Sequence, residues 1–428
     1  MLVLLWAVPA SAMPDGGSMI IIHNNQSFER TEILLISSRD FGKHAITSYP
    51  VITRNHTQLI SQPADINKDG LWDILFMEVH LLPFSADTLS LHWQAGQPGI
   101  YKKLVNVRFS LRGSNGLPQR EINDSFRLRG YIQDIGNPVY QLEGPGIEND
   151  KVAFRVFFDH RNGKDIYGKL IPDPVLDTIG INSSWHTLQN WGMDILKTGR
   201  SLGAGAFAVR EAGINYKLAD ADSSVFTQLC EGPLAASFRL DFYHWDAGTK
   251  KLRGSEVITL LKGDYFYTTT LHLPLTSGQT LLQGFANFYD DSLTVLKHNR
   301  TYCSVSTFGK QAEGTSSMLG LAIMVPQQSF LSSGCDDSTG TLPNSCYVNM
   351  KIQHSITTLF FACWEKTAAR FTEKQGFSGY LQEVADRLAH PVQITISKNM
   401  NDAKKTVYQG VFDDGFKSFA GTTGSKGQ

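Results

Sequence analysis

Between residues 235 and 287 the chain repeats one pattern: a short run of alternating or apolar residues, followed by a turn that contains glycine or lysine. Alternation with a period of two places successive side chains on opposite faces of a β-strand. Strands that recur at regular spacing, with turn residues between them, are typical of antiparallel sandwiches. The runs are 235–243, 256–261, 265–272 and 280–287. We therefore expect an all-β protein built around a large antiparallel β-sandwich.

The rest of the chain divides into parts around this sandwich. Residues 1–12 are apolar and end in Ala-Ser-Ala, which is typical of a signal peptide that is removed on export, so a periplasmic or secreted location is expected. Further strand-like runs predict a smaller N-terminal β domain over 19–110 and place the large sandwich, the expected catalytic domain, over 111–397. Apolar residues at helical spacing predict one helix at 379–388, and the polar composition of 398–428 indicates a frayed tail.

Charge and cysteine usage argue against several classes of protein. The formal net charge is −1 and no basic arm is present, which argues against nucleic acid as a partner. After the N-terminal run, no stretch reaches the ~18 apolar residues of a membrane span, so no membrane insertion is expected. Cys335 and Cys346 flank a polar loop that a disulfide can close in an oxidising compartment, and no CxxC pair indicates zinc or redox chemistry. The oligomeric state stays open.

Charged, aromatic and glycine residues crowd together most densely between 152 and 209. The first part of this stretch alternates, so Arg155 falls on the polar face of a predicted strand. The dipeptide Asn162-Gly163 favours a tight hairpin, because both positions tolerate positive φ. A two-residue turn there would place Asp165 on the opposite face from Arg155, whereas a longer or bulged turn would bring both onto one face. Both registers stay open from the residues alone.

Two further groups of residues supply candidates for a site. Aromatic and ionisable residues gather in a short span that a glycine-rich strand, 199–209, follows; they are Trp185, His186, Trp191, Asp194 and Lys197. The predicted strand at 235–243 ends in a second group, Tyr243, His244 and Trp245. A packed sheet with solvated polar residues and structural ion pairs explains such clusters equally well, because ion-pair networks also gather charges.

Three blocks in this stretch and just before it resemble the signature of a bacterial family. They are EGPG at 143–146, FFDHRNGKDIYGK at 157–169, and WH followed by NWGMDILKTGRSLGAG within 185–205. These blocks are similar to those of the domain-of-unknown-function 4861 family of polysaccharide-utilisation clusters, and the resemblance runs from about residue 20 to about residue 396. It implies a supersandwich-like all-β fold. It also implies an enzyme that acts on plant or algal, uronate-containing oligosaccharides, with loss of water from a sugar ring as the expected reaction.

Removal of water from a sugar needs a base for a ring C–H proton, a group that stabilises the developing charge, and an acid for the departing oxygen. We expect His186 to transfer the proton, with Tyr243 as its acid–base partner, in a cleft formed by 155–169, 185–200 and 241–246. The catalytic candidates are His186, Tyr243, Lys197 and Asp194. The substrate-binding candidates are Arg155, Asp159, Arg161, Lys169, Trp185, Trp191, His244 and Trp245. No cofactor is expected for the chemistry.

Other reactions stay open. A polysaccharide lyase would break a glycosidic bond by elimination. A glycoside hydrolase would need two carboxylates, ~5 Å or ~6.5–9.5 Å apart, for which Asp159 and Asp194 are the candidates. A non-catalytic glycan-binding protein would need aromatic platforms without an acid–base pair.

A separate motif lies in the predicted N-terminal domain. The segment 65–73 reads D-x-N-x-D-G-x-x-D, in which glycine permits a sharp turn and the oxygen-bearing side chains stand at the spacing of ligands for a hard cation. The ligand candidates are Asp65, Asn67, Asp69 and Asp73. Phe76 stands where an EF-hand has its bidentate glutamate, so the loop is not an EF-hand. A structural Ca²⁺, which we favour, and a turn without metal both stay open.

Overall fold

The computed structural model describes residues 18–41, 48–96, 101–113, 120–134, 138–181, 184–351, 354–397 and 403–407. Its sheets are antiparallel, and one α-helix, α1 (Lys374–Ala389), is present in the described chain. The expected all-β class with a C-terminal helix is therefore confirmed. The expected signal peptide, 1–12, lies outside the described residues. Among the described helices, none combines the length and apolar character needed to cross a membrane.

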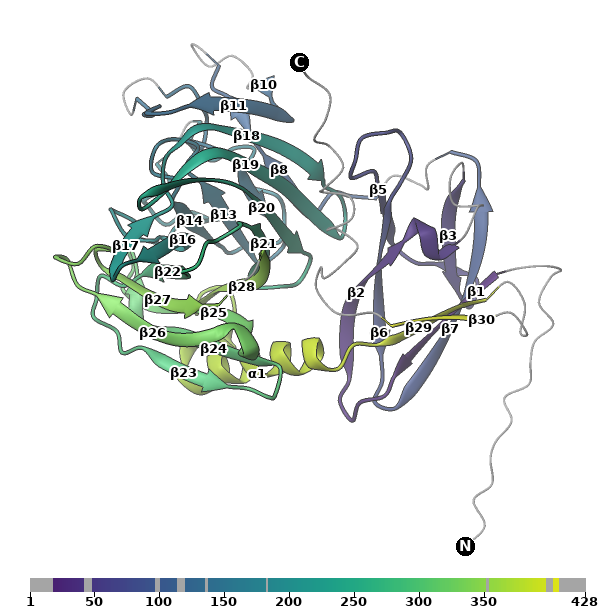
Figure 1. Ribbon diagram of the computed structural model, residues 1–428. Coiled ribbons are helices and arrows are strands. Elements are labelled where there is room, and N and C mark those ends of the chain that lie inside the picture. Colours follow the sequence, from purple (N-terminus) through teal and green to yellow (C-terminus); the bar gives the residue numbers. More distant parts are fainter. Residues whose placement is uncertain are drawn as a thin grey trace, which may run out of the picture.

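The large sandwich contains one broad sheet and two smaller ones (Figure 1). The nine-stranded sheet has the order β11 (Asp124–Leu128), β18 (Ala221–Cys230), β19 (Ala235–Ala247), β20 (Lys250–Leu261), β21 (Phe266–His272), β28 (Ser355–Trp364), β25 (Ser317–Pro326), β24 (Tyr302–Ala312) and β23 (Thr294–Lys297). One five-stranded sheet, here called the polar sheet, has the order β15 (Gly192–Asp194), β14 (Lys164–Lys169), β13 (Val152–Val156), β12 (Gly146–Glu148) and β8 (Asn106–Arg108). The other has the order β17 (Ile214–Lys217), β16 (Ala204–Glu211), β22 (Gln279–Ala286), β27 (Ser345–Met350) and β26 (Phe330–Asp336), and β9 (Ser110–Leu111) pairs with β10 (Arg120–Glu121).

One hydrophobic core joins these three sheets. Phe154 of the polar sheet packs in the same buried cluster as Phe285 of β22 and Phe360 of β28. Each of these rings is almost fully buried, and burying such a side chain contributes roughly 1.5–3 kcal/mol to stability. The core explains why the strands predicted from alternation form one sandwich, since the apolar face of each strand is covered by an opposing sheet.

A smaller β-sandwich lies beside the large one (Figure 1). One of its sheets has the order β30 (Ala403–Val407), β29 (Gln393–Ser397), β1 (Ser18–Asn24), β7 (Ser85–Gln94), β3 (Tyr49–Arg54) and β4 (Thr57–Gln58). The other consists of β2 (Arg30–Ser37), β6 (Ile74–Leu81) and β5 (Ser61–Ala64). Because β29 pairs with β1, the C-terminal strand completes the N-terminal unit.

The pairing of strands differs from the expected boundaries at both ends of the large domain. The expected large domain, 111–397, includes β29, which the structure places in the N-terminal sandwich. The expected N-terminal domain, 19–110, includes β8, which pairs with β12 of the polar sheet. Part of the expected tail, 398–428, forms β30. Alternation identifies a strand but not its partner, because pairing is decided by long-range contacts.

Helix α1 covers the outer face of the nine-stranded sheet. Its residues Phe377 and Leu381 are buried against Phe361 of β28 and Met324 of β25. The helix begins at Lys374, ahead of the expected start at 379, because Phe377 extends the same apolar stripe towards the N-terminus.

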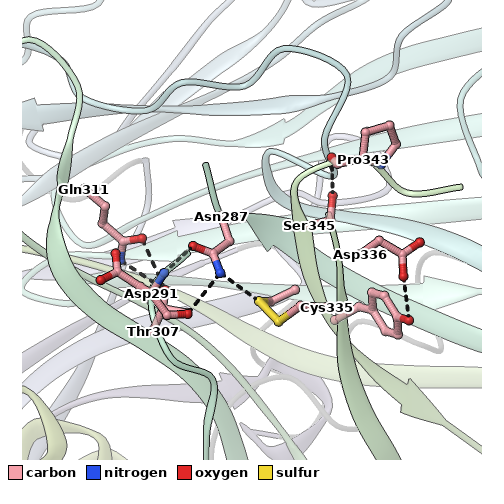
Figure 2. Close-up of a disulfide and its surroundings, with 10 residues drawn as sticks. Asn287, Asp291, Thr307, Gln311, Cys335, Asp336, Pro343 and Ser345 are labelled. Carbon is pink, nitrogen blue, oxygen red and sulfur yellow. Dashed lines mark hydrogen bonds between the residues drawn. A yellow bond between two sulfur atoms is a disulfide. The ribbon is translucent and has the colours of Figure 1, made fainter. Parts of the chain in front are cut away.

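The expected disulfide between Cys335 and Cys346 is present and joins opposed residues of β26 and β27 (Figure 2). The remaining cysteines, Cys230, Cys303 and Cys363, are buried free thiols.

Candidate functional site

The polar sheet places most of its charged residues on one face, while Lys164 lies on the other face and pairs with Glu256 at 2.8 Å. Arg155 of β13 lies directly opposite Asp165 of β14, and Tyr167 lies opposite Asp194 of β15. The connection between β13 and β14 is the loop 157–163. The tight two-residue hairpin is therefore wrong, and the longer turn brings both sets of polar side chains together.

The polar face is buried beneath the segments that follow and precede the strands. Leu142, Val175, Leu176 and Ile179 form an apolar cluster with Ala153 and Tyr167, against which Trp185 and Trp191 pack. The opposite face of the same strands belongs to the sandwich core. The charged residues of the polar sheet are thus enclosed between two apolar layers, where electrostatic interactions are stronger than in water.

A glycine lets the strand that carries Asp194 approach its neighbour. Gly192 has a φ of +131°, and a Cβ there would lie 1.8 Å from the carbonyl oxygen of Gly168. A side chain at this position is excluded, so the glycine in the NWGMD block is needed for the pairing of β14 and β15.

Arg155 is the central cation of the face. Its Nη2 lies 2.7 Å from Asp165 Oδ2 and 3.6 Å from Asp194 Oδ2, and its Nη1 lies 3.8 Å from Glu143 Oε1. The side chain is 5 % exposed. Three aromatic rings lie within 5.4 Å of the guanidinium carbon: Phe157, Tyr167 and Trp185. One cation thus serves three carboxylates inside an aromatic enclosure, which leaves an excess of negative charge.

The excess of negative charge affects Asp194, which contacts His186. Burial raises the pKa of Asp194 well above its usual value; the charge of Asp165 adds to this rise, and Arg155 opposes it. Nδ1 of His186 lies 3.8 Å from Asp194 Oδ2, and the histidine side chain is 66 % exposed whereas the aspartate is 3 % exposed. The pair joins a solvent-facing imidazole to a buried carboxyl group that favours its protonated form, an arrangement suited to proton transfer.

Three hydrogen-bond donors around Arg155 have no partner among the described residues. They are Nη1 of Arg155, the hydroxyl of Tyr167 and Nε1 of Trp185, and all three are buried. Burial raises the pKa of Tyr167 well above its usual value, so its hydroxyl remains a donor. Buried polar groups are nearly always hydrogen-bonded in folded proteins, so donors grouped in this way suit an oxygen-rich ligand.

The ion pairs continue from the polar face to the surface. Arg161 donates through Nη2 to Glu143 Oε2 at 2.6 Å and through Nε to Asp159 Oδ2 at 2.9 Å. Glu143 therefore links Arg161 to Arg155, and Asp159 also binds Arg161. The Arg161 side chain is partly exposed, so it can contact a ligand from the edge of the face.

Two lysine candidates occupy different environments. Nζ of Lys169 is fully buried, 2.7 Å from Glu148 Oε2, and donates to the carbonyl of Asn149. Lys197 is exposed, with its Nζ 4.8 Å from the centre of the Phe288 ring. Lys169 thus has internal partners, whereas Lys197 is accessible to a ligand.

Residues 241–246, which were expected to line the cleft with 155–169 and 185–200, do not bring their candidate side chains to the polar face. Tyr243 lies on β19 opposite Ser223, with the guanidinium of Arg253 4.7 Å from its ring, and no described contact links it to the block at 185–200. His244 contacts Asp222 at 2.9 Å. Trp245 is fully buried and stacks on Phe242, so it cannot stack on a sugar in this conformation. A β-bulge between Phe242 and Trp245, with His244 at a φ of +55°, turns Trp245 into the core, which the aromatic cluster alone does not reveal.

Sequence reasoning missed three members of the face. Glu143 stands in the EGPG block, and Asp165 and Tyr167 share the parity of Lys169. Each of them is an ionisable residue within one of the signature blocks, which was a signal for a site. Their convergence on Arg155 depends on the register of β13 and β14.

The loop 65–73 of the small sandwich closes through its own side chains. Asp65 accepts hydrogen bonds from the backbone of Asp69 and Gly70, and Asp73 accepts from the backbone of Ile66 and Asn67. Within the described part of the chain, no group of three or more histidine, cysteine or acidic residues is placed to hold a metal. Calcium binding by this loop stays a prediction.

Comparison with known proteins finds a family that covers most of the chain. The family model described as "Domain of unknown function (DUF4861)" matches residues 22–394. "Uncharacterized protein P7" of Formosa agariphila is 21 % identical over 272 residues, which cover 58 % of this chain and 66 % of that protein, just under two thirds of its length.

Two solved structures also show a distant similarity. An alpha-mannosidase from Enterococcus faecalis V583 has a TM-score of 0.47 at 9 % identity, covering 90 % of this chain and 46 % of that one. A glycosyl hydrolase family 38 protein from Enterococcus faecalis has a TM-score of 0.47 at 10 % identity, covering 90 % and 48 %. This chain thus spans about half the length of these structures, and similarity of this extent supports no conclusion about function.

Proposed function

The chain belongs to the DUF4861 family, and on that premise we propose that it is a carbohydrate-active enzyme, a carbon–oxygen lyase that removes water from a sugar ring of uronate-containing oligosaccharides. The substrate class and the reaction come from the resemblance of the blocks at 143–146, 157–169 and 185–205 to the family signature. We place the reaction at the polar sheet, where His186 faces solvent.

The pair of His186 and Asp194 is the observation that carries this proposal. His186 is exposed to solvent, and the buried carboxyl group of Asp194 lies 3.8 Å from its Nδ1, within the range of an ion pair. The raised pKa of Asp194 favours a protonated carboxyl group, and His186 beside it is of the residue type most often used as a general base. A histidine next to a buried acid is a common arrangement for proton transfer.

The donors around Arg155 supply the second requirement, stabilisation of negative charge. Nη1 of Arg155, the Tyr167 hydroxyl and Nε1 of Trp185 suit a carboxylate or carbonyl oxygen of the substrate. Charge that develops next to the carbon losing its proton would be stabilised by these donors, because they lie in an enclosed, apolar surrounding.

The proposed reaction balances without a cofactor. His186 takes a proton from a ring carbon, the electron pair forms a carbon–carbon double bond, and the neighbouring C–O bond breaks. The protonated His186 returns its proton to the departing oxygen, which leaves as water. The products are an unsaturated sugar ring and one water molecule, and the histidine is regenerated.

Mass measurement on uronate-containing oligosaccharides tests the proposal. A product that has lost one water without cleavage is the expected result, and its formation should stop in the His186→Ala variant. Cleavage with an unsaturated end would show a polysaccharide lyase, and cleavage with gain of water a glycoside hydrolase. Binding without any change in mass would show a glycan-binding protein. Mass decides where absorbance does not, because an unconjugated double bond absorbs weakly.

A further inference from the structure

Two segments from outside the polar sheet border the stretch 186–199, which carries His186 and Lys197. The first is the turn 313–316 between β24 and β25. The backbone N–H of Glu313 donates to the carbonyl of Ile195 at 2.9 Å. A Cβ at Gly314 would lie 3.5 Å from the carbonyl oxygen of His186. The turn therefore packs directly against the segment that carries His186 and Asp194.

The second is the loop 287–291 that follows β22. The ring of Phe288 lies so close to Gly199 that a Cβ there would be 2.9 Å from the ring, and Lys197 lies over the same ring. Tyr289, the next residue, is 49 % exposed. Burial raises the pKa of Tyr289, and the charge of Glu313 adds to the rise. The turn that carries Glu313 bonds to Ile195, and the ring next to Tyr289 lies under Lys197, so both segments border the stretch 195–199.

The loop that carries Tyr289 is held at its base (Figure 2). Asn287 accepts a hydrogen bond from the backbone of Asp291 at 3.0 Å and donates to its carbonyl at 3.0 Å. The same amide lies 3.2 Å from the sulfur of Cys346, which belongs to the disulfide. An exposed aromatic ring on a held loop is preorganised for binding, because little conformational entropy is lost when a ligand stacks on it.

We propose that Tyr289, Lys197 and Glu313 form a second subsite, which takes the pyranose ring next to the reacting one. The inference rests on the proposed function. The face of Tyr289 packs on the apolar face of the sugar ring, and Lys197 and Glu313 hydrogen-bond its hydroxyl groups. The subsite makes the enzyme prefer longer oligosaccharides, since the shortest substrate does not reach it.

The experiment compares Tyr289→Ala, Tyr289→Phe and wild type on oligosaccharides of increasing length. Loss of the ring should raise KM for the longer substrates roughly 3- to 10-fold, the value of one aromatic contact, with kcat within about twofold. KM for the shortest substrate should not change, and Tyr289→Phe should behave as wild type. Phe126→Ala, which removes an exposed aromatic ring from β11, is the matched control and should leave KM unchanged.

The outcomes separate this inference from the proposed function. Normal turnover with an unchanged KM for Tyr289→Ala at every length overturns the subsite alone. If wild type converts no oligosaccharide but binds one in calorimetry, the reaction is wrong, and weaker binding by Tyr289→Ala still supports the subsite. Absence of both binding and turnover in wild type overturns both.

Discussion

His186 and Asp194 lie 3.8 Å apart, Nδ1 to Oδ2, across the boundary between solvent and the buried face of the polar sheet. The carboxyl group is enclosed with Asp165 and Arg155, whereas the imidazole is open to a substrate. Asp194 thus provides a buried carboxyl group with a raised pKa, and His186 provides access to solvent. Groups whose pKa is shifted by burial and by charged neighbours are concentrated at functional sites.

The first prediction concerns this pair. His186→Ala and Asp194→Asn should each lower turnover by about 10²–10⁴-fold, because proton transfer by a positioned residue contributes that much. The measurement is kcat on an accepted oligosaccharide, with folding checked by circular dichroism. His80 is the matched control, since it is also half exposed and contacts Glu29 at 3.2 Å on the small sandwich. His80→Ala should keep turnover; normal turnover in folded His186→Ala would remove the assignment.

The second prediction concerns stability. Arg155→Met leaves Asp165 and Asp194 without their cation, while Glu143 keeps Arg161, and should cost about 3–5 kcal/mol, the range for breaking a buried ion pair. Arg129→Met is the matched comparison, because Arg129 also contacts two acids but is 38 % exposed. Exposed pairs contribute about 0–1 kcal/mol. Denaturant unfolding of both variants is the measurement, and equal losses would contradict a special role for the buried cation.

Local pattern predicted the strands well. The runs at 235–243 and 265–272 correspond to β19 (Ala235–Ala247) and β21 (Phe266–His272), because their alternation follows directly from one buried face. Strand partners were not predictable in the same way. The pairing of β29 with β1 joins opposite ends of the chain, and nothing local in either strand specifies it.

The site was predicted in its composition but not in its geometry. Trp185, His186 and Asp194 were identified by their crowding in one short span, and the structure brings them to Arg155. The proposed partnership of His186 with Tyr243 found no support, because closeness across a sandwich depends on which sheet each strand joins. The convergence of the acidic residues on Arg155 was likewise not predictable, because it depends on the length of the loop 157–163.

The third prediction concerns pH. Burial raises the pKa of Asp264 to about 6, with Glu32 and Asp150 adding to the rise and Arg387 opposing it. The unfolded value is about 3.9, so between pH ~4 and ~6 the folded protein binds more protons than the unfolded chain. The free energy of unfolding should therefore fall as pH rises through this window, by about 1–3 kcal/mol. Asp264→Asn should lose this dependence in urea melts from pH 4 to 8; identical slopes for the two proteins would contradict it.

The fourth prediction concerns the disulfide. Cys335 and Cys346 close a loop with a sequence separation of 11, for which the chain-entropy model gives about 2–3 kcal/mol. A reductant should lower the melting temperature of wild type and leave a Cys335→Ser/Cys346→Ser double variant unchanged. Burial raises the pKa of the Cys230 thiol to about 12, so that thiol does not take part. A reductant effect of equal size in both proteins would reject the assignment. A stabilising disulfide fits the exported location that residues 1–12 predict.

The last prediction concerns calcium at the loop 65–73. Protein purified without chelator should contain about one equivalent of Ca²⁺, and a chelator should lower its melting temperature, because an ion bound only by the folded state stabilises it. Asp65→Asn and Asp69→Asn are sharper tests than alanine, because asparagine keeps one oxygen, which can accept the backbone hydrogen bond at position 69 and one of the two at position 65. Each change removes one negative charge, so both variants should fold and should melt at the same temperature with Ca²⁺ as with chelator. A wild type that melts identically in Ca²⁺ and in chelator would show that the side chains only shape a turn.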